Sequence, residues 1–324
     1  MNQGAGSVTA FAPATVANVA VGFDVLGFAL DGVGDRVTVR IAESTTEPVV
    51  VDGIDGVVTD LPTDPRRNTA SVALRAMVDD LGIDRALGVH VHKGIPLGSG
   101  MGGSAASAVG AVVAADRLLG LGLGRDRLLE YALAGEAAAS GAPHADNAAP
   151  CLHGGLTAVV SHDPQRIVDL PVPSGIAYVI VHPRLRIETR AARAILARHV
   201  PLGMFVEQSM RLAGFVAGCY RDDLGLIESS MVDLMAGPQR ARLIPGFDDA
   251  RQAATYAGAF AFAISGSGPS VFAWVRAQGA PGAVAEEVRE AFRRNGLVAE
   301  SWTGSLGSPG ARIVDGEGEP ACGS

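Results

Sequence analysis

The segment that most constrains the fold is a glycine-rich turn between a strand pattern and an alanine-rich stretch. It reads GIPLGSGMGGSAAS, from Gly94 to Ser107, and contains five glycines. Residues 87–92 before it predict a strand, and residues 104–119 after it predict a helix. This order favours an anion site, because glycines let backbone N–H groups turn toward one ligand and a helix N-terminus adds positive charge.

Several known loop types compete for this segment. Gly98 starts a Gly-x-Gly-x-x-Gly spacing typical of dinucleotide sites, but Ile95, Pro96 and Leu97 intervene between the strand and this glycine. The next acid, Asp116, comes too early. A Walker A loop needs a lysine directly before its serine or threonine, but Gly103 stands before Ser104, so this loop type is excluded. A nucleophile elbow needs a glycine where Ala106 stands. A plain strand-to-helix turn with Ser104 as N-cap stays open beside the phosphate loop.

Composition predicts a globular protein and argues against several classes of partner. The 324 residues are 48% hydrophobic, enough for about two domains. The net charge of −8 argues against general nucleic-acid binding. No apolar run is long enough to span a bilayer, and the N-terminal residues lack the blocks of a signal peptide. Cys151, Cys219 and Cys322 lie far apart, without disulfide or zinc spacing. We expect a cytoplasmic protein that binds neither nucleic acid nor membrane.

Periodicity and turn residues predict the remaining elements. Strands are expected at residues 8–12, 35–42, 87–92, 156–161, 176–182, 260–265, 271–276 and 298–303. Helices are expected at residues 68–81, 104–119, 125–140, 190–198, 203–219 and 281–295. Residues 141–155 are expected to form a loop. These short mixed units indicate an α/β or α+β class.

A proline-rich run around residues 161–175 marks the expected domain boundary. It divides the chain into domains 1–165 and 166–314. The polar residues 315–324 are expected to form a disordered tail.

The glycine loop resembles the phosphate loop of the GHMP kinases, which reads P-x-x-x-G-L-G-S-S-A-A. Pro96–Ala106 reads PLGSGMGGSAA. Met101 replaces the family's leucine. Gly103 replaces the first serine of its pair, so a hydroxyl role there rests on Ser104.

Three further blocks extend the resemblance over almost the whole chain. Residues 12–31 (APATVANVAVGFDVLGFALD) and 140–155 (SGAPHADNAAPCLHGG) are similar to two signatures of the homoserine kinase group. Residues 263–275 (AISGSGPSVFAWV) resemble the third GHMP motif, whose glycine turn packs near the active site.

The resemblance implies an α+β GHMP kinase fold. Its N-terminal, ATP-binding domain would resemble ribosomal S5 domain 2, and its C-terminal domain would be ferredoxin-like. It implies transfer of a phosphoryl group from ATP to the side-chain hydroxyl of L-homoserine, with Mg²⁺, as an early step of threonine synthesis, by a homodimer. A mevalonate or sugar kinase and a catalytically silent ATP-binding regulator are the alternatives.

For ATP, the resemblance implies contacts along the loop and two residues before it. These residues are Asn68, Lys93, Pro96, Leu97, Gly98, Ser99, Gly100, Met101, Gly102, Gly103, Ser104, Ala105 and Ala106. Lys93 is the single lysine among 26 basic side chains. Either the site needs a compact ammonium there, or codon usage explains the bias.

The magnesium ligands implied by the resemblance are Ser104 and Glu136. Glu136 continues the apolar stripe of Leu129, Ala132 and Leu133 at helical spacing. A carboxylate in such a stripe is costly unless it is paired or metal-bound. A solvated helix face is the alternative.

For the amino-acid substrate, the resemblance implies contacts by Asn18, Asp24, His144, Asp146, Asn147, Arg193 and Arg240. Asp24 suits the α-amino group and the arginines suit the carboxylate. Asn147 would orient the acceptor hydroxyl, so that Asn147, Glu136 and Ser104 form the catalytic set. Asx turns are the alternative for the loop residues, and Arg242 competes with Arg240. No general base stands out, although Asp24 stays open as one; a loose transition state does not require one.

Overall fold

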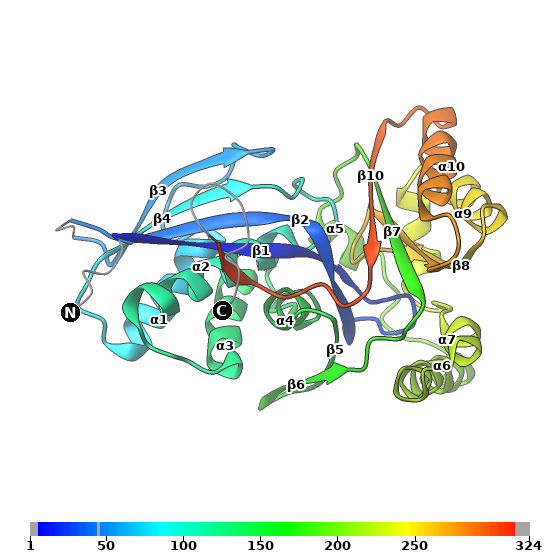
Figure 1. Cartoon of the computed structure of the whole chain (residues 1–324), viewed down its shortest axis with the longest axis horizontal. Helices are drawn as coiled ribbons and strands as arrows, with labels where there is room; N and C mark the ends of the chain where they lie inside the picture. Colours follow the sequence, from blue (N-terminus) through cyan, green and yellow to red (C-terminus); the bar gives the residue numbers. More distant parts are fainter. Residues whose placement is uncertain (1–5, 44–45, 315–324) are drawn as a thin grey trace.

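The computed structural model describes residues 6–43 and 46–314, arranged around two β-sheets. Figure 1 shows the larger sheet on one side of the molecule and the smaller sheet, with its helices, on the other. The expected tail 315–324, with Cys322, lies outside the described residues.

The larger sheet has seven strands. In space their order is β11-β1-β2-β4-β3, and β5 extends from one end of β2 and pairs with β6. The bounds are β1 (Ser7–Ala17), β2 (Leu26–Ile41), β3 (Val49–Gly56), β4 (Leu87–Lys93), β5 (Leu156–His162), β6 (Gln165–Leu170) and β11 (Arg312–Val314). Only β3 and β4 are paired in parallel among these described strands.

Four helices pack with this sheet. They are α1 (Thr69–Leu81), α2 (Gly103–Leu119), α3 (Arg125–Ser140) and α4 (Ala145–His153). The small residues of α2 let it lie close to β1 and β2: a Cβ on Gly110 would come within 2.7 Å of Val37 Cγ2. The helix that starts at the glycine loop is therefore held rigidly on the sheet.

The smaller sheet has the strand order β10-β7-β9-β8, all antiparallel. Its strands are β7 (Ile176–Pro183), β8 (Ala259–Ile264), β9 (Val271–Arg276) and β10 (Ala299–Ser305), accompanied by α6 (Leu202–Arg221), α7 (Leu224–Ser230), α9 (Phe247–Tyr256) and α10 (Pro281–Arg294). This is the order of a ferredoxin-like βαββαβ unit, so the expected α+β fold is confirmed.

Aromatic side chains fill the junction between the two sheets. Phe28 of β2 contacts Tyr178, Phe272 and Trp274 of the smaller sheet, with ring centroids 5.7–5.8 Å apart. Phe215 of α6 also packs on Trp274, with ring centroids 6.0 Å apart. This buried cluster fixes one sheet against the other.

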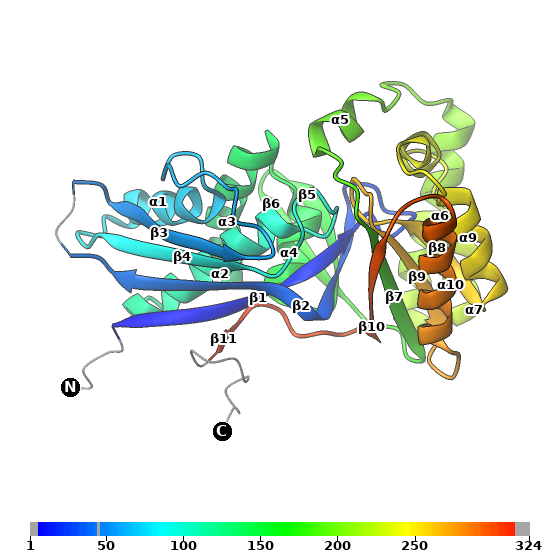
Figure 2. The ribbon, with the colours of Figure 1, turned by 90° about the horizontal axis from the view of Figure 1, so that it is seen from above.

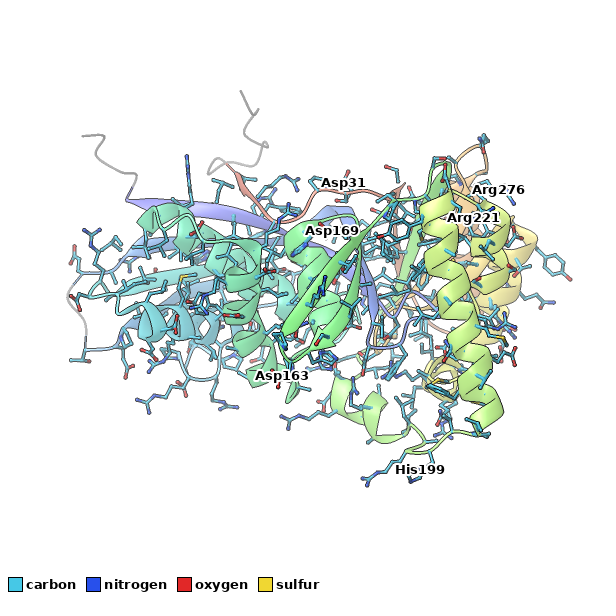
Figure 3. The ribbon with its side chains drawn as sticks, turned by 90° about the horizontal axis from the view of Figure 1, so that it is seen from below. Asp31, Asp163, Asp169, His199, Arg221 and Arg276 are labelled. Atoms are coloured by element: carbon cyan, nitrogen blue, oxygen red, sulfur yellow. The ribbon has the colours of Figure 1, made fainter. Side chains whose placement is uncertain are left out.

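The segment between β7 and α6 lies over the junction. It contains α5 (Thr189–Ala194), which Figure 2 shows standing apart from the two sheets. Figure 3 labels His199 farther along, where the segment reaches the edge of the molecule. Two short turns, α8 (Gly237–Arg240) and η1 (Ala241–Leu243), precede α9.

Four expectations about local structure were wrong. The helix expected at residues 190–198 ends at Ala194. β1 does not stop at Pro13 but continues to Ala17, because a register shift between Pro13 and Thr15 accommodates the proline. β2 begins at Leu26, well before residue 35. Residues 145–153 form helix α4 instead of a loop, with Pro150 inside it.

Burial explains how α4 tolerates its proline. Pro150 cannot donate to the Asp146 carbonyl one turn earlier. That carbonyl lies against Gly27 of β2, where a Cβ would come within 1.9 Å of the oxygen. Packing against the strand holds the turn in place of the missing hydrogen bond.

The sheets also bear on the domain boundary. β6 begins at the expected division, at Gln165, and β11 lies beyond it, yet both pair with strands of the larger sheet. The domains 1–165 and 166–314 stay a prediction. No helix within the described ranges is long and apolar enough to cross a membrane.

Candidate active site

A cavity of about 600 Å³ opens at the junction of the two sheets. Its wall comes from the glycine loop, the β1–β2 turn, α3, α4, the start of α5 and the turn after β8. Among the sequence-predicted residues, the cavity is lined by Asn18, Asp24, Asn68, Lys93, Pro96, Leu97, Gly98, Ser99, Gly100, Gly102, Gly103, Ser104, Glu136, His144, Asp146, Asn147, Arg193 and Arg240. Met101, Ala105 and Ala106 do not line it and are fully buried.

The glycine loop has a backbone that other residues would strain. Gly98, Gly100 and Gly102 have φ angles of 63°, 78° and 69°. A Cβ on Gly100 would lie 2.5 Å from the carbonyl oxygen of Ser265. The loop therefore packs directly on the turn of the second sheet, and a bare backbone faces the cavity.

Helix α2 begins at Gly103, and its N-cap is Gly102, without a side-chain capping bond. The N-cap role considered for Ser104 is therefore wrong. Ser104 lies in the first turn and lines the cavity instead. The uncapped N–H groups of this turn suit an anion such as a phosphate.

Lys93 lies beneath the loop with its side chain almost fully buried. Its ammonium donates to Asp35, to the Gly103 carbonyl (2.8 Å) and to Ser107 Oγ (3.0 Å). These bonds use all three ammonium hydrogens. The other Asp35 oxygen accepts the N–H groups of Gly94 and Ile95. Lys93 thus anchors both ends of the loop; its contact with ATP stays a prediction.

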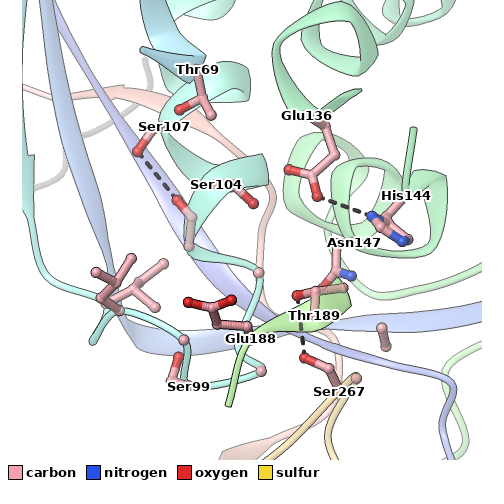
Figure 4. A pocket seen from close by; sticks show the side chains of 18 of the residues that line it. Thr69, Ser99, Ser104, Ser107, Glu136, His144, Asn147, Glu188, Thr189 and Ser267 are labelled. Carbon is pink, nitrogen blue, oxygen red and sulfur yellow. Dashed lines mark hydrogen bonds and ion pairs between the residues drawn. The ribbon is translucent and has the colours of Figure 1, made fainter. Parts of the chain in front are cut away.

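Glu136 faces the cavity from α3 and is only 4% exposed. This burial excludes a solvated helix face. His144 lies beside it, with Nδ1 3.2 Å from Glu136 Oε1, as Figure 4 shows. That hydrogen bond raises the pKa of His144 above its usual value.

Asp146 is buried at the first turn of α4. Burial, together with the negative charge of Asp24, raises its pKa to about 7. A proton on this carboxyl turns an acceptor into a donor that a polar substrate group would meet.

Opposite charges meet where the β1–β2 turn, α5 and α8 line the cavity. Arg193 Nη2 lies 2.9 Å from both carboxylate oxygens of Asp24. Phe23 packs against both Arg193 and Arg240, with the guanidinium carbons 5.6 Å and 5.2 Å from the ring centroid. Arg240 lines the cavity, whereas Arg242 does not, which favours Arg240; its contact with the substrate stays a prediction.

Asn18 connects the charged part of the cavity wall to the second sheet. Its Nδ2 donates to the Gly266 carbonyl (2.9 Å), and its Oδ1 accepts the N–H of Asp24 (3.0 Å). The same carbonyl accepts Arg240 Nη1 (2.8 Å). Asn18, Val19 and Ala20 all have positive φ angles, a strained run of non-glycine residues of the kind that clusters at functional sites.

Asn68 is placed at the wall, but its polar atoms are engaged. Its Oδ1 caps α1 by accepting the N–H groups of Ala70 and Ser71, and its Nδ2 donates to the Pro62 carbonyl. A nucleotide contact by Asn68 stays a prediction.

Sequence reasoning missed three residues that support the site: Thr15, Asp35 and Ser107. Thr15 Oγ1 donates to Asn147 Oδ1 at 2.9 Å. Ser107 Oγ donates to Asp35 at 2.8 Å. The one available signal was Asp35, an acid at the start of an alternating apolar strand.

The oxygen donors at the cavity suit Mg²⁺. Glu136 offers a carboxylate and Ser104 a hydroxyl, the hard ligands that Mg²⁺ prefers. In residues 6–43 and 46–314 no group of three or more His, Cys, Asp or Glu is arranged to hold a metal. Magnesium commonly takes one or two carboxylates, with phosphate oxygens and water completing its shell.

Comparisons with known proteins agree with this geometry. Residues 68–155 match the GHMP kinase N-terminal domain, and residues 215–294 match the GHMP kinase C-terminal domain. Two relatives, both homoserine kinases, come from Xylella fastidiosa (47% identity over 94% of this chain and 93% of the relative) and Xanthomonas campestris (45%, over 96% and 95%).

A solved structure agrees over nearly the whole chain. The crystal structure of homoserine kinase from Cytophaga hutchinsonii has a TM-score of 0.93 and 40% identity, covering 97% of this chain and 99% of that one. The chain belongs to the GHMP kinase family, and within it to the homoserine kinases.

Proposed function

We propose that this enzyme transfers the γ-phosphoryl group of ATP to the side-chain hydroxyl of L-homoserine. The observation that carries the proposal is that one cavity combines two chemically different walls. One part of its wall is a glycine loop with an uncapped helix start, and another part carries Asp24 with Arg193 and Arg240. Phosphates suit the first part, and an amino acid suits the second.

The charged part of the wall fits a zwitterion. Asp24 and Arg193 pair with each other. An α-ammonium group offers Asp24 an opposite charge, and an α-carboxylate offers Arg193 a planar partner for its guanidinium. Mevalonate and sugars lack the amino group, so they would leave the Asp24 carboxylate without a cationic partner in the substrate.

In the reaction, the homoserine hydroxyl oxygen forms a bond to the γ-phosphorus, and the bond from that phosphorus to the bridging oxygen of ADP breaks. Asn147 orients the hydroxyl, and the backbone N–H groups at the start of α2 hold the phosphates. The hydroxyl proton leaves late in a loose transition state and passes to an oxygen of the transferred phosphoryl group, so no strong base is needed.

Ser104 and Glu136 are the residues that would hold Mg²⁺. When bound, the ion neutralises charge on the phosphate oxygens. A cytoplasmic location, a homodimer and a place in threonine synthesis remain predictions.

The test is a phosphoryl-transfer assay with ATP, Mg²⁺ and a panel of acceptors. We expect ADP release and a new phosphomonoester signal by ³¹P NMR with L-homoserine. 4-Hydroxybutyrate, which keeps the acceptor hydroxyl but has no α-amino group, mevalonate and galactose should give at most a few per cent of that rate. Equal rates with mevalonate or galactose, or no transfer to any acceptor, would refute the proposal.

A further inference from the structure

Thr15 lies on β1 behind the wall of the cavity and does not line it. Its side chain is fully buried. Oγ1 donates to Asn147 Oδ1 at 2.9 Å, across 132 residues of sequence. Its backbone N–H donates to the carbonyl of Met101 in the glycine loop at 3.1 Å. One residue therefore contacts both the phosphate loop and the amide expected to orient the acceptor.

In the structure, the hydroxyl of Thr15 engages the oxygen end of the Asn147 amide. The amide is planar, with an acceptor oxygen at one end and two N–H donors at the other. Oδ1 is held from behind by Thr15. Within residues 6–43 and 46–314, Nδ2 donates to no protein atom, so its hydrogens are available to a ligand.

The hydroxyl of Thr15 has little freedom to move. A β-branched side chain has few χ1 positions. A Cβ on Gly102 would lie 2.1 Å from Thr15 Oγ1 and 2.9 Å from Asn147 Oδ1. The absent side chain of Gly102 therefore makes room for this hydrogen bond, which fixes the amide relative to the loop.

We propose that Thr15 is a positioning residue: its hydroxyl orients the Asn147 amide so that Nδ2 donates to the acceptor hydroxyl beside the bound phosphates. This inference rests on the proposed function, in which Asn147 meets the acceptor. Thr15 itself touches neither substrate. Without its hydroxyl the amide would rotate, and the acceptor would lose its alignment with the γ-phosphorus.

The first test compares Thr15→Val, which keeps the shape but removes the hydroxyl, with Thr15→Ser, which keeps the hydroxyl. We expect kcat to fall about 5- to 20-fold in Thr15→Val, the effect of one hydrogen bond, with the KM for ATP unchanged. Thr15→Ser should stay within about twofold of the parent in kcat. If Thr15→Val keeps full kcat, or Thr15→Ser loses as much, the proposal is wrong.

Thr157→Val is the matched control. Thr157 is also a fully buried strand threonine, but its hydroxyl has no hydrogen-bond partner among the described residues, and it lies outside the cavity wall. Its replacement should leave kcat unchanged. Thermal unfolding checks that each variant is folded. If Thr15→Val does not fold, Thr15→Ala against Thr15→Ser makes the same comparison.

A double variant separates this proposal from the proposed function. In an Asn147→Ala background, Thr15→Val should cause no further loss of kcat, because the two residues act through one contact. An equal further loss would overturn the positioning role while leaving the function intact. Full activity of Asn147→Ala alone would instead refute the role of Asn147 in the proposed function.

Discussion

At the residue scale, the site depends on pairs that restrict each other. Asp24 is held by Arg193, and Asn147 by Thr15. His144 contacts Glu136 through one ring nitrogen and Arg193 through the other, at 3.2 Å and 3.3 Å. Each functional group therefore reaches the cavity with its orientation already determined, which lowers the cost of aligning substrates.

Glu136 gives the prediction at this scale. Glu136→Gln keeps the shape but removes the charge that would neutralise a magnesium ion. We expect kcat to fall about 100-fold or more, since a metal-assisted step loses several kcal/mol. The fall should shrink as Mg²⁺ is raised. The measurement is a magnesium titration of the initial rate.

The control for this substitution is Glu130→Gln on the same helix. Glu130 is half-exposed, pairs with Arg127 and lies outside the cavity wall, so its variant should behave as the parent does. Near-normal turnover of Glu136→Gln at ordinary Mg²⁺ would rule out the metal role.

At the element scale, the sequence predicted local structure well where periodicity and caps agree. Helix α3 was expected at residues 125–140 and has those bounds. Prediction from the sequence failed where tertiary packing overrides local signals. Pro13 predicted the end of a strand that in fact continues, and Pro150 predicted a loop where a helix forms. In both cases burial against a neighbouring strand outweighed the local preference of proline.

The candidate site, like the fold, could be predicted from the sequence only in part. The loop glycines and Glu136 follow from residue type and spacing. The supporting contacts do not, because Thr15 and Asn147, or Asp35 and Lys93, are far apart in sequence and meet only in the folded chain.

The loop anchor gives a prediction at this scale. Lys93→Arg puts a larger, planar cation into a buried space shaped for an ammonium. We expect the free energy of unfolding to fall by about 2–4 kcal/mol and the KM for ATP to rise, because the loop shifts. Chemical denaturation and steady-state kinetics measure the two effects.

The matched substitution is Arg40→Lys at the exposed Arg40–Asp52 pair. It should change the free energy of unfolding by less than about 1 kcal/mol. Codon usage accounts for the rarity of lysine if Lys93→Arg lowers the free energy of unfolding no more than Arg40→Lys does and leaves the KM for ATP unchanged.

At the scale of the whole molecule, the cavity needs both sheets. The glycine loop and Glu136 come from the N-terminal part, whereas Arg193, Arg240 and Gly266 come from the part around the smaller sheet. The aromatic cluster of Phe28 with Trp274 keeps these parts in register. We therefore assign ATP to the glycine-loop part of a single cavity and the amino acid to the part that carries Asp24, Arg193 and Arg240.

The most direct test of this assignment is two-substrate kinetics of Arg193→Ala. We expect the KM for L-homoserine to rise about 30- to 100-fold, because a charge-assisted bond to the carboxylate is lost, while the KM for ATP changes less than twofold. The control is Arg198→Ala. Arg198 lines a second, neighbouring pocket that also has Arg193 in its wall, but it lies outside this cavity, so both KM values should stay unchanged. A rise confined to the KM for ATP would contradict the assignment of the two parts.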